Sequence, residues 1–293
     1  FIGSESLEAF TQTIAPAATT LSITSSESTC EYGTSLDFTI TVEQQDESKV
    51  TPAGLVQLYI DGVEFMSPMA LDVDGKVIRT VPYLNLWPGK HDITAEFVPA
   101  NSAHFEGSDN ATNPLVQTVL KATPVITISP SVDEPVASQL VGFAVQVSHD
   151  FRDEIIPSGM VQFFVDGVAL GDPVQLDSQG KAQSPETIRL DAGSYDVTVS
   201  YAGDEYFQTV DESAAYQQSI VKADSVVVIT NVDPISVVVG QDATISVKVS
   251  VVDPATKMPY GKVDVRVGSE TCEVTLDANG EGSCVIATDS TGE

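Results

Sequence analysis

Hydrophobic and polar residues alternate along most of this chain, in the period-two pattern of a half-buried β-strand. In one run Val141, Phe143, Val145 and Val147 share a face, with small or polar residues between them. Similar runs cover 36–42 and 243–251. Each predicts a strand with one face on a core and the other in water. No stretch has a helical period, so the pattern favours an all-β fold.

One stretch of this kind occurs three times. It reads G-L-V-Q-L-Y-I-D-G at Gly54–Gly62, G-M-V-Q-F-F-V-D-G at Gly159–Gly167 and, in a weaker form, G-K-V-D-V-R-V-G at Gly261–Gly268. The first glycines of the three copies are 105 and then 102 residues apart. A period near one hundred residues is too long for a solenoid repeat and fits a β-sandwich domain.

Turn signals separate the predicted strands within each copy. Asp61-Gly62 and Asp166-Gly167 are typical of two-residue hairpin turns, in which glycine supplies a positive φ. A second glycine turn follows in each copy, at Asp74-Gly75, Gln179-Gly180 and Asn279-Gly280. About seven strands per copy, with turns every 8–12 residues or so, predict a two-sheet antiparallel sandwich.

The repeats divide the chain into one short segment and three domains. We expect residues 1–16 to be the closing strand of a preceding repeat, because Phe1–Ile14 resembles the closing segments of the later copies. The domains are then 17–122, 123–223 and 224–293, which we call the first, second and third repeats; the last is incomplete. The chain is expected to be a window from a longer tandem array. Its very short linkers predict a stiff rod of domains arranged end to end.

Charge narrows the classes of partner. Thirteen basic and forty-two acidic residues give a net charge of −29. Nucleic acid and anionic membrane surfaces are poor partners for such a chain, because phosphate contacts need clustered lysine and arginine. No run approaches the ~20 apolar residues of a membrane span. The scattered acidic residues indicate a solvated, self-repelling surface.

With the strands placed, the motifs resemble a known family. The pattern G-x-V-x-F-x-x-D-G, then L-x-x-x-G, then L-x-x-G-x-Y-x-V-T-x-x-Y-x-G-D-x-x-F is similar to that of bacterial Ig-like repeats, and the second repeat fits it best. The resemblance implies tandem Ig-like sandwiches of an extracellular or cell-surface protein. It specifies the domain type and leaves the function open, because this fold carries many roles.

The cysteines suggest one covalent link. Cys272 and Cys284 flank the turn at Asn279-Gly280 almost symmetrically, so we expect them to face each other on a hairpin and form a disulfide, with a metal site or free thiols as alternatives. A disulfide implies an oxidising compartment. Cys30 is expected to be a free thiol, or to pair outside this chain.

Other candidate sites are weaker. Asp72 with Asp74 and Asp204 with Glu205 could contribute to a calcium site, although turn chemistry alone explains aspartate there; no other cofactor is expected. The three histidines, His91, His104 and His149, have no zinc spacing and are expected at the surface or in turns. Asn110-Ala111-Thr112 fits an N-glycosylation acceptor. Trp87 in L-W-P-G could contact a glycan or pack at a sandwich end.

No catalytic motif is present, so the expected function is a non-catalytic structural or adhesive stalk in a longer surface protein. Its partners would be the neighbouring domains of the same chain, with host or surface glycans or proteins as further possibilities. One alternative is an accessory spacer or glycan-binding module of a secreted carbohydrate-active enzyme. Another is a subunit of an extracellular filament or sheath assembled through strand exchange.

Overall fold

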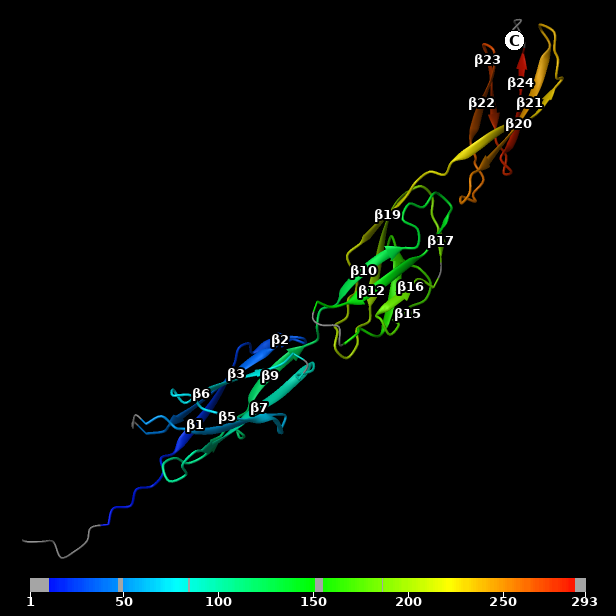
Figure 1. Ribbon diagram of the computed structural model, residues 1–293. Coiled ribbons are helices and arrows are strands. Elements are labelled where there is room, and N and C mark those ends of the chain that lie inside the picture. Colours follow the sequence, from blue (N-terminus) through cyan, green and yellow to red (C-terminus); the bar gives the residue numbers. More distant parts are fainter. Residues whose placement is uncertain (1–10, 47–49, 84, 151–154, 186, 288–293) are drawn as a thin grey trace, which may run out of the picture. The chain divides into compact units, whose positions relative to one another are not determined.

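The computed structural model describes residues 11–46, 50–83, 85–150, 155–185 and 187–287, and every helix or strand assigned in these ranges is a β-strand (Figure 1). The expected all-β class is therefore confirmed. The described residues form two compact units. One unit contains the described residues up to Pro124 and those in 149–152 and 204–208. The other unit contains the remaining described residues. The strands of each sheet all come from a single repeat.

The first repeat is a sandwich of two sheets. One sheet has the order β1 (Thr19–Ser25), β3 (Leu36–Gln44), β6 (Lys76–Val81). The other has the order β2 (Thr29–Glu31), β9 (Leu115–Leu120), β7 (Gly89–Pro99), β4 (Gly54–Ile60), β5 (Val63–Ala70), with β8 (Ser108–Asp109) on β7. All pairs are antiparallel except β2 with β9, which run parallel. The opening strand of the repeat therefore changes sheets, from β1 in one to β2 in the other.

The core of the first repeat consists of the side chains that the alternation placed on one face. Phe38 and Ile40 of β3 are buried, as are Leu58 of β4 and Phe97 of β7. The residues between them along β3 and β7 are exposed or half-buried, whereas Gln57 of β4 is itself buried. This is how two sheets bury one face each while the other faces stay hydrated.

The second repeat uses the same plan with shorter strands. One sheet contains β10 (Val125–Pro130), β12 (Phe143–Ser148) and β16 (Lys181–Gln183). The other has the order β14 (Val168–Ala169), β13 (Met160–Val165), β18 (Gly193–Tyr201), β19 (Tyr216–Ile220), with β15 (Val174–Gln175) on β13 and a separate pair β11 (Leu140–Val141) with β17 (Ile188–Arg189). Phe163 lies opposite Val199, as Leu58 lies opposite Ala95 in the first repeat.

The third repeat has fewer strands in the described residues. One sheet is β20 (Ser225–Asp233), β21 (Asp242–Val251), β24 (Glu281–Ala287), and the other is the pair β22 (Lys262–Val267) and β23 (Glu270–Thr275). Its core includes Ile245, Val247, Val265 and Val274. Every residue of β20 is exposed. The strand that would correspond to β7 or β18 is not among the described residues.

The two Asp-Gly turns have the predicted form. Asp61 and Gly62 have φ of 51° and 77°, and Asp166 and Gly167 have φ of 47° and 74°. Two successive positive φ values define the type I′ turn, whose twist matches that of a β-hairpin. The prediction from the dipeptides is confirmed.

The second glycine turn does more than reverse the chain. The glycine carbonyl accepts a hydrogen bond from a β3-type strand in every repeat: Val42 N–H donates to Gly75, Val147 N–H to Gly180 and Val249 N–H to Gly280. A Cβ at Gly180 would lie 2.5 Å from the Val147 carbonyl oxygen. The glycine is therefore required both for its positive φ and for this close approach.

The segment expected to be a donated closing strand, Phe1–Ile14, lies mostly outside the described residues. Residues 11–14 are described and belong to no regular element. Strand exchange by this segment stays a prediction.

Candidate functional site

The residues that enter the first and second sandwiches are anchored by a hydrogen-bonded clamp. In the first repeat Ala17 N–H donates to the His104 carbonyl at 2.8 Å, and Glu106 N–H donates to the Ala17 carbonyl at 2.9 Å. These bonds form a parallel bridge between Ala17 and Phe105. Phe105 is buried, so its ring pins the bridge to the core.

The same clamp is present at the next linker, within the same compact unit. Ala122 N–H donates to the Tyr206 carbonyl at 2.8 Å, and Gln208 N–H donates to the Ala122 carbonyl at 3.0 Å. Ala122 is 1% exposed and Phe207 is fully buried. We call the two sets of contacts the linker clamps: Ala17 with Phe105, and Ala122 with Phe207.

Aspartate and asparagine shape the loops that form the clamps. Asp204 Oδ1 accepts from the N–H groups of Tyr206 and Phe207, both at 2.8 Å. In the first repeat Asn101 Oδ1 accepts from Ala103 N–H at 2.9 Å. These are Asx turns, in which a short polar side chain holds its own backbone in a bend. The G-D-x-x-F motif of the second repeat, and A-N-S-A-H-F at the same place in the first, are thus explained as parts of the clamps. Sequence reasoning did not assign them this role.

The acidic pairs considered for calcium are used in turns. Asp72 Oδ1 accepts from Asp74 N–H at 2.9 Å and from Lys76 N–H at 2.8 Å. Asp204 is engaged as described above. Within the described ranges no group of three or more histidine, cysteine, aspartate or glutamate side chains is placed to hold a metal ion. Calcium binding therefore stays a prediction without structural support.

His91 is buried, 3% exposed, so the expectation of a surface or turn residue was wrong for it. Its Nδ1 lies 2.7 Å from Asp61 Oδ2, and its Nε2 lies 2.8 Å from the Trp87 carbonyl oxygen. Both ring nitrogens therefore lie against oxygen atoms. The signal was in the sequence, because His91 is in phase with the inward-facing Ile93 of β7.

The other two histidines differ from each other. His104 is exposed, as expected. His149 is half-buried, and its ring stacks on that of Phe207 with 5.3 Å between centroids. Neither histidine joins a metal-binding group.

Trp87 presents its ring to solvent at 59% exposure, so it does not pack into the end of the sandwich. Its carbonyl is held by His91, which fixes the backbone beneath the ring. The second repeat has the same arrangement without the tryptophan, since the Tyr195 hydroxyl donates to the Asp191 carbonyl at 3.2 Å. Trp87 is thus an exposed aromatic residue whose backbone carbonyl is held by a hydrogen bond.

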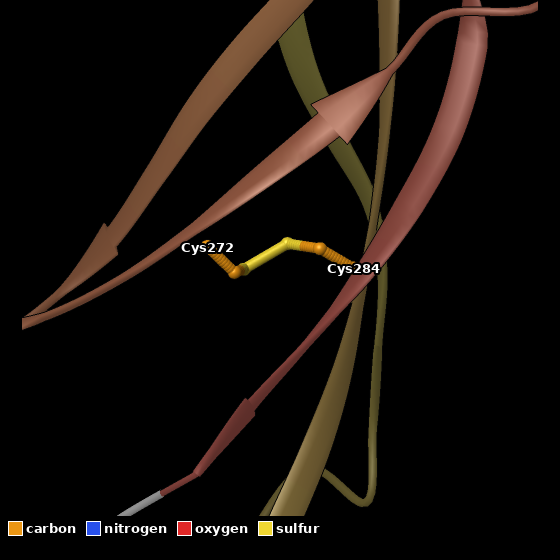
Figure 2. Close-up of a disulfide and its surroundings, with 2 residues drawn as sticks. All are labelled: Cys272 and Cys284. Carbon is orange, nitrogen blue, oxygen red and sulfur yellow. A yellow bond between two sulfur atoms is a disulfide. The ribbon is translucent and has the colours of Figure 1, made fainter.

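The structure contains the Cys272–Cys284 disulfide, with 6.0 Å between the Cα atoms (Figure 2). The expectation that the two cysteines face each other on one hairpin was wrong. Cys272 lies on β23, which pairs with β22, whereas Cys284 lies on β24, which pairs with β21. The turn between them carries the chain from one sheet to the other. The bond therefore joins the two sheets through the core.

Cys30 is a buried free thiol in β2. Burial, with a smaller contribution from the charge of Glu27, raises the pKa of this thiol above its ordinary value. A thiol that stays protonated and buried is a poor nucleophile. It acts here as a small core residue.

Asn110, the glycosylation candidate, is bound to the edge of β7. Its Oδ1 accepts from Ala95 N–H at 2.7 Å, and its Nδ2 donates to the Ile93 carbonyl at 3.3 Å. Ser213 takes this place in the second repeat, where its Oγ accepts from Val199 N–H at 3.0 Å. A glycan on Asn110 would be attached at the nitrogen that makes one of these bonds. Glycosylation here stays a prediction.

Ser138, in the second unit, is a further residue that the sequence did not single out. It is buried and has a positive φ of 66°, which is uncommon outside glycine. Its Oγ accepts from Thr256 N–H at 2.9 Å and from Lys257 N–H at 2.8 Å. These bonds explain why a strained backbone is kept at this position.

Comparison with known proteins supports the domain type. The family model of the bacterial Ig-like domain (group 3) matches residues 127–221. The comparison with curated proteins gives no match. No helix long and apolar enough to cross a membrane is found in the described part of the chain.

Several solved structures are similar to the chain at low identity. A tetra-tandem repeat in the extending region of a large adhesion protein is 16% identical, over 94% of this chain and 66% of that one, with a TM-score of 0.35. Invasin, a bacterial integrin-binding protein, is 12% identical, over 92% of this chain and 55% of that one, with a TM-score of 0.45. FdeC, an Escherichia coli adhesin, is 13% identical, over 93% of this chain and 88% of that one, with a TM-score of 0.31. The chain thus spans less than two thirds of the length of the first two. Residues 127–221 match the bacterial Ig-like family that the repeated motifs resemble, and the first and third repeats carry versions of the same motifs.

Proposed function

We propose that this chain is a stalk segment: a non-catalytic series of Ig-like repeats that holds other parts of an extracellular or cell-surface protein at a distance. The observation that carries this proposal is the pair of linker clamps. Ala17 and Ala122 each use both backbone hydrogen-bonding groups in a bridge to a loop with a buried phenylalanine.

A clamped linker behaves differently from a free one. A glycine- or serine-rich spacer keeps its backbone freedom and lets domains reorient. A linker residue whose N–H and carbonyl are both bonded has lost that freedom. Repetition of the clamp, with only a few residues in each linker, favours repeats that keep their spacing under load.

The charge of the chain supports the same role. A net charge of −29 repels like-charged parts of the chain, opposing collapse and clumping. The core of each repeat is built mainly from apolar side chains, and the carboxylates of Asp72 and Asp204 are used in turns. A role in spacing and surface contact therefore accounts for these features better than a catalytic role does.

Small-angle X-ray scattering of the full chain tests the proposal. A compact globule of this length would have a radius of gyration of about 19 Å. A stalk requires a clearly larger radius of gyration. A radius near that of the globule would contradict the proposal. Ala122→Pro removes the N–H that bonds to Tyr206 and should broaden the distribution of interatomic distances. Ala122→Ser keeps the N–H and serves as the matched control.

A second candidate, an accessory glycan-binding module, is favoured by one observation. Trp87 is exposed while its backbone is fixed by the buried His91, and a rigid exposed aromatic ring is a common platform for a ligand face. Binding of the chain to immobilised glycans should fall in Trp87→Ala and persist in Tyr260→Ala, which removes another exposed aromatic ring. Equal binding by both variants would exclude Trp87 as the contact.

A further inference from the structure

Two buried glutamines occupy equivalent places in the first two repeats. Gln117 lies in V-Q-T-V-L-K on β9, and Gln218 lies in Q-Q-S-I-V-K on β19. Their exposed fractions are 0% and 1%. In each, the side-chain Oε1 has no hydrogen-bond partner among the described residues. Buried carbonyl oxygens almost always accept a hydrogen bond. An unpaired oxygen at the same place in two repeats therefore indicates a missing donor.

The orientation of both amides is fixed by their other end. Gln117 Nε2 donates to the Thr118 carbonyl at 3.3 Å, and Gln218 Nε2 donates to the Ser219 carbonyl at 3.1 Å. Turning either amide over would place two acceptor oxygens against each other. The unpaired atom is therefore an acceptor in both repeats, and its missing partner must be a donor.

The polar side chains directly across the strand pairs are already engaged by other groups. His91 lies opposite Gln117, and Tyr195 lies opposite Gln218. His91 is committed to Asp61 and the Trp87 carbonyl, and the Tyr195 hydroxyl is committed to the Asp191 carbonyl.

Cys30 does not explain the pair either. Its Sγ lies 3.9 Å from Gln117 Nε2, which is the donor end of the amide. The second repeat has no cysteine at all, yet Gln218 has the same unpaired oxygen. Among the described residues, no side chain therefore supplies a partner that the two repeats share.

Both glutamines lie beside the point where the opening strand changes sheets. In the first repeat the opening strand leaves β3 after Ser25 and joins β9 at Thr29, which pairs with Thr118, the residue next to Gln117. In the second repeat β10 ends at Pro130, and Val136 then bridges to Val221 on the strand segment that follows Gln218. Where a strand changes sheets, the regular interdigitation of two sheet faces is interrupted.

We propose that each of these two repeats binds one internal water molecule, which donates a hydrogen bond to Oε1 of Gln117 or Gln218. Water fits because it is the smallest available donor, and internal water commonly satisfies buried polar groups of this kind. The site is independent of the proposed stalk function. It accounts for the retention of a glutamine in a core position that would otherwise suit an apolar side chain.

Magnetic relaxation dispersion of the water nuclei, measured on the full chain, counts internal waters of long residence. Gln117→Met and Gln218→Met keep an unbranched side chain of similar length and remove the acceptor. Each variant should lose one internal water, and the double variant should lose two. An unchanged dispersion amplitude in folded variants would overturn the proposal.

If the glutamine variants do not fold, a crystal structure tests the proposal instead. In an atomic-resolution crystal structure of the unaltered chain, electron density for water should lie within hydrogen-bond distance of Oε1 in both repeats. A dry Oε1 in both repeats would equally overturn the proposal. Water must be found at both Gln117 and Gln218, because the two residues occupy equivalent positions.

Discussion

Cys30 and Val119 are paired across the parallel strands β2 and β9, so the opening and closing strands of the first repeat are bonded directly to each other. Tyr32 N–H donates to the Leu120 carbonyl at 2.8 Å and Thr118 N–H to the Ser28 carbonyl at 3.4 Å. A pull on the two ends of the repeat loads such bonds together, in shear. In the described residues of the second repeat, the corresponding contact is one bridge between Val136 and Val221, made by two backbone hydrogen bonds.

We therefore predict that the first repeat unfolds at a higher force than the second. Thr118→Pro removes the N–H that bonds to Ser28 and should lower the force for the first repeat. Thr118→Val keeps that N–H and is the control. Single-molecule force spectroscopy on the full chain measures both. Equal forces for Thr118→Pro and Thr118→Val would contradict the shear mechanism.

Loss of the disulfide should destabilise the third repeat. Cys272 and Cys284 are 12 residues apart in sequence, and closing a loop of that size stabilises a fold by about 3 kcal/mol in the chain-entropy treatment. The double variant Cys272→Ala/Cys284→Ala should unfold at a lower denaturant concentration. Cys30→Ala, which removes the free thiol, serves as the control for the effect of reductant. If reductant leaves the unfolding of the third repeat unchanged, the bond does not contribute to its stability.

Two glycines of the second repeat separate backbone strain from steric clash. Gly167 and Gly180 have nearly equal φ, 74° and 73°, but an added Cβ meets nothing within 4 Å at Gly167 and the Val147 carbonyl oxygen at 2.5 Å at Gly180. Gly167→Ala should cost roughly 1–2 kcal/mol for the left-handed backbone. Gly180→Ala should cost roughly 2 kcal/mol more, since the strand must shift. Denaturant unfolding monitored in the second repeat measures the difference, and equal losses would refute the role of the close approach.

The Asp177 and Asp277 turns should make stability depend on acid pH. Backbone N–H groups of Lys181 and Gln179 lower the pKa of Asp177 below its ordinary value of 3.8, and those of Glu281 and Asn279 do the same for Asp277. A depressed folded-state pKa stabilises the fold above the unfolded value, and this contribution is lost as pH falls through the folded value. Stability should thus decline below about pH 3.8.

Asp177→Asn tests this dependence, because the amide oxygen can still accept the two hydrogen bonds but does not titrate in this range. Urea unfolding of the second repeat, followed from pH 5 or so down to pH 2 or so, should show a shallower decline in the variant. Parallel curves for the variant and the unaltered chain would rule out this carboxylate as a source of acid sensitivity.

The sequence alone determined the class of fold, the strands and the period of the repeats. The inward face of β3, with Phe38 and Ile40, follows from alternation, because a strand sends successive side chains to opposite faces. The Asp61-Gly62 turn followed from the dipeptide, since few residues accept two successive positive φ values. The cysteine pair was also found in this way, although on the assumption that it closes a hairpin.

Only the tertiary structure decided which strands share a sheet. Pairing joins residues far apart in the chain, so β23 and β24 look like a hairpin in sequence but belong to different sheets. For the same reason the sequence did not reveal the linker clamps, in which the Ala122 backbone bonds to the residues on either side of Phe207. Nor did it reveal that Asp61 is the partner of His91. Alternation reports the face that a residue occupies. The partner across that face is fixed by the packing of the whole domain.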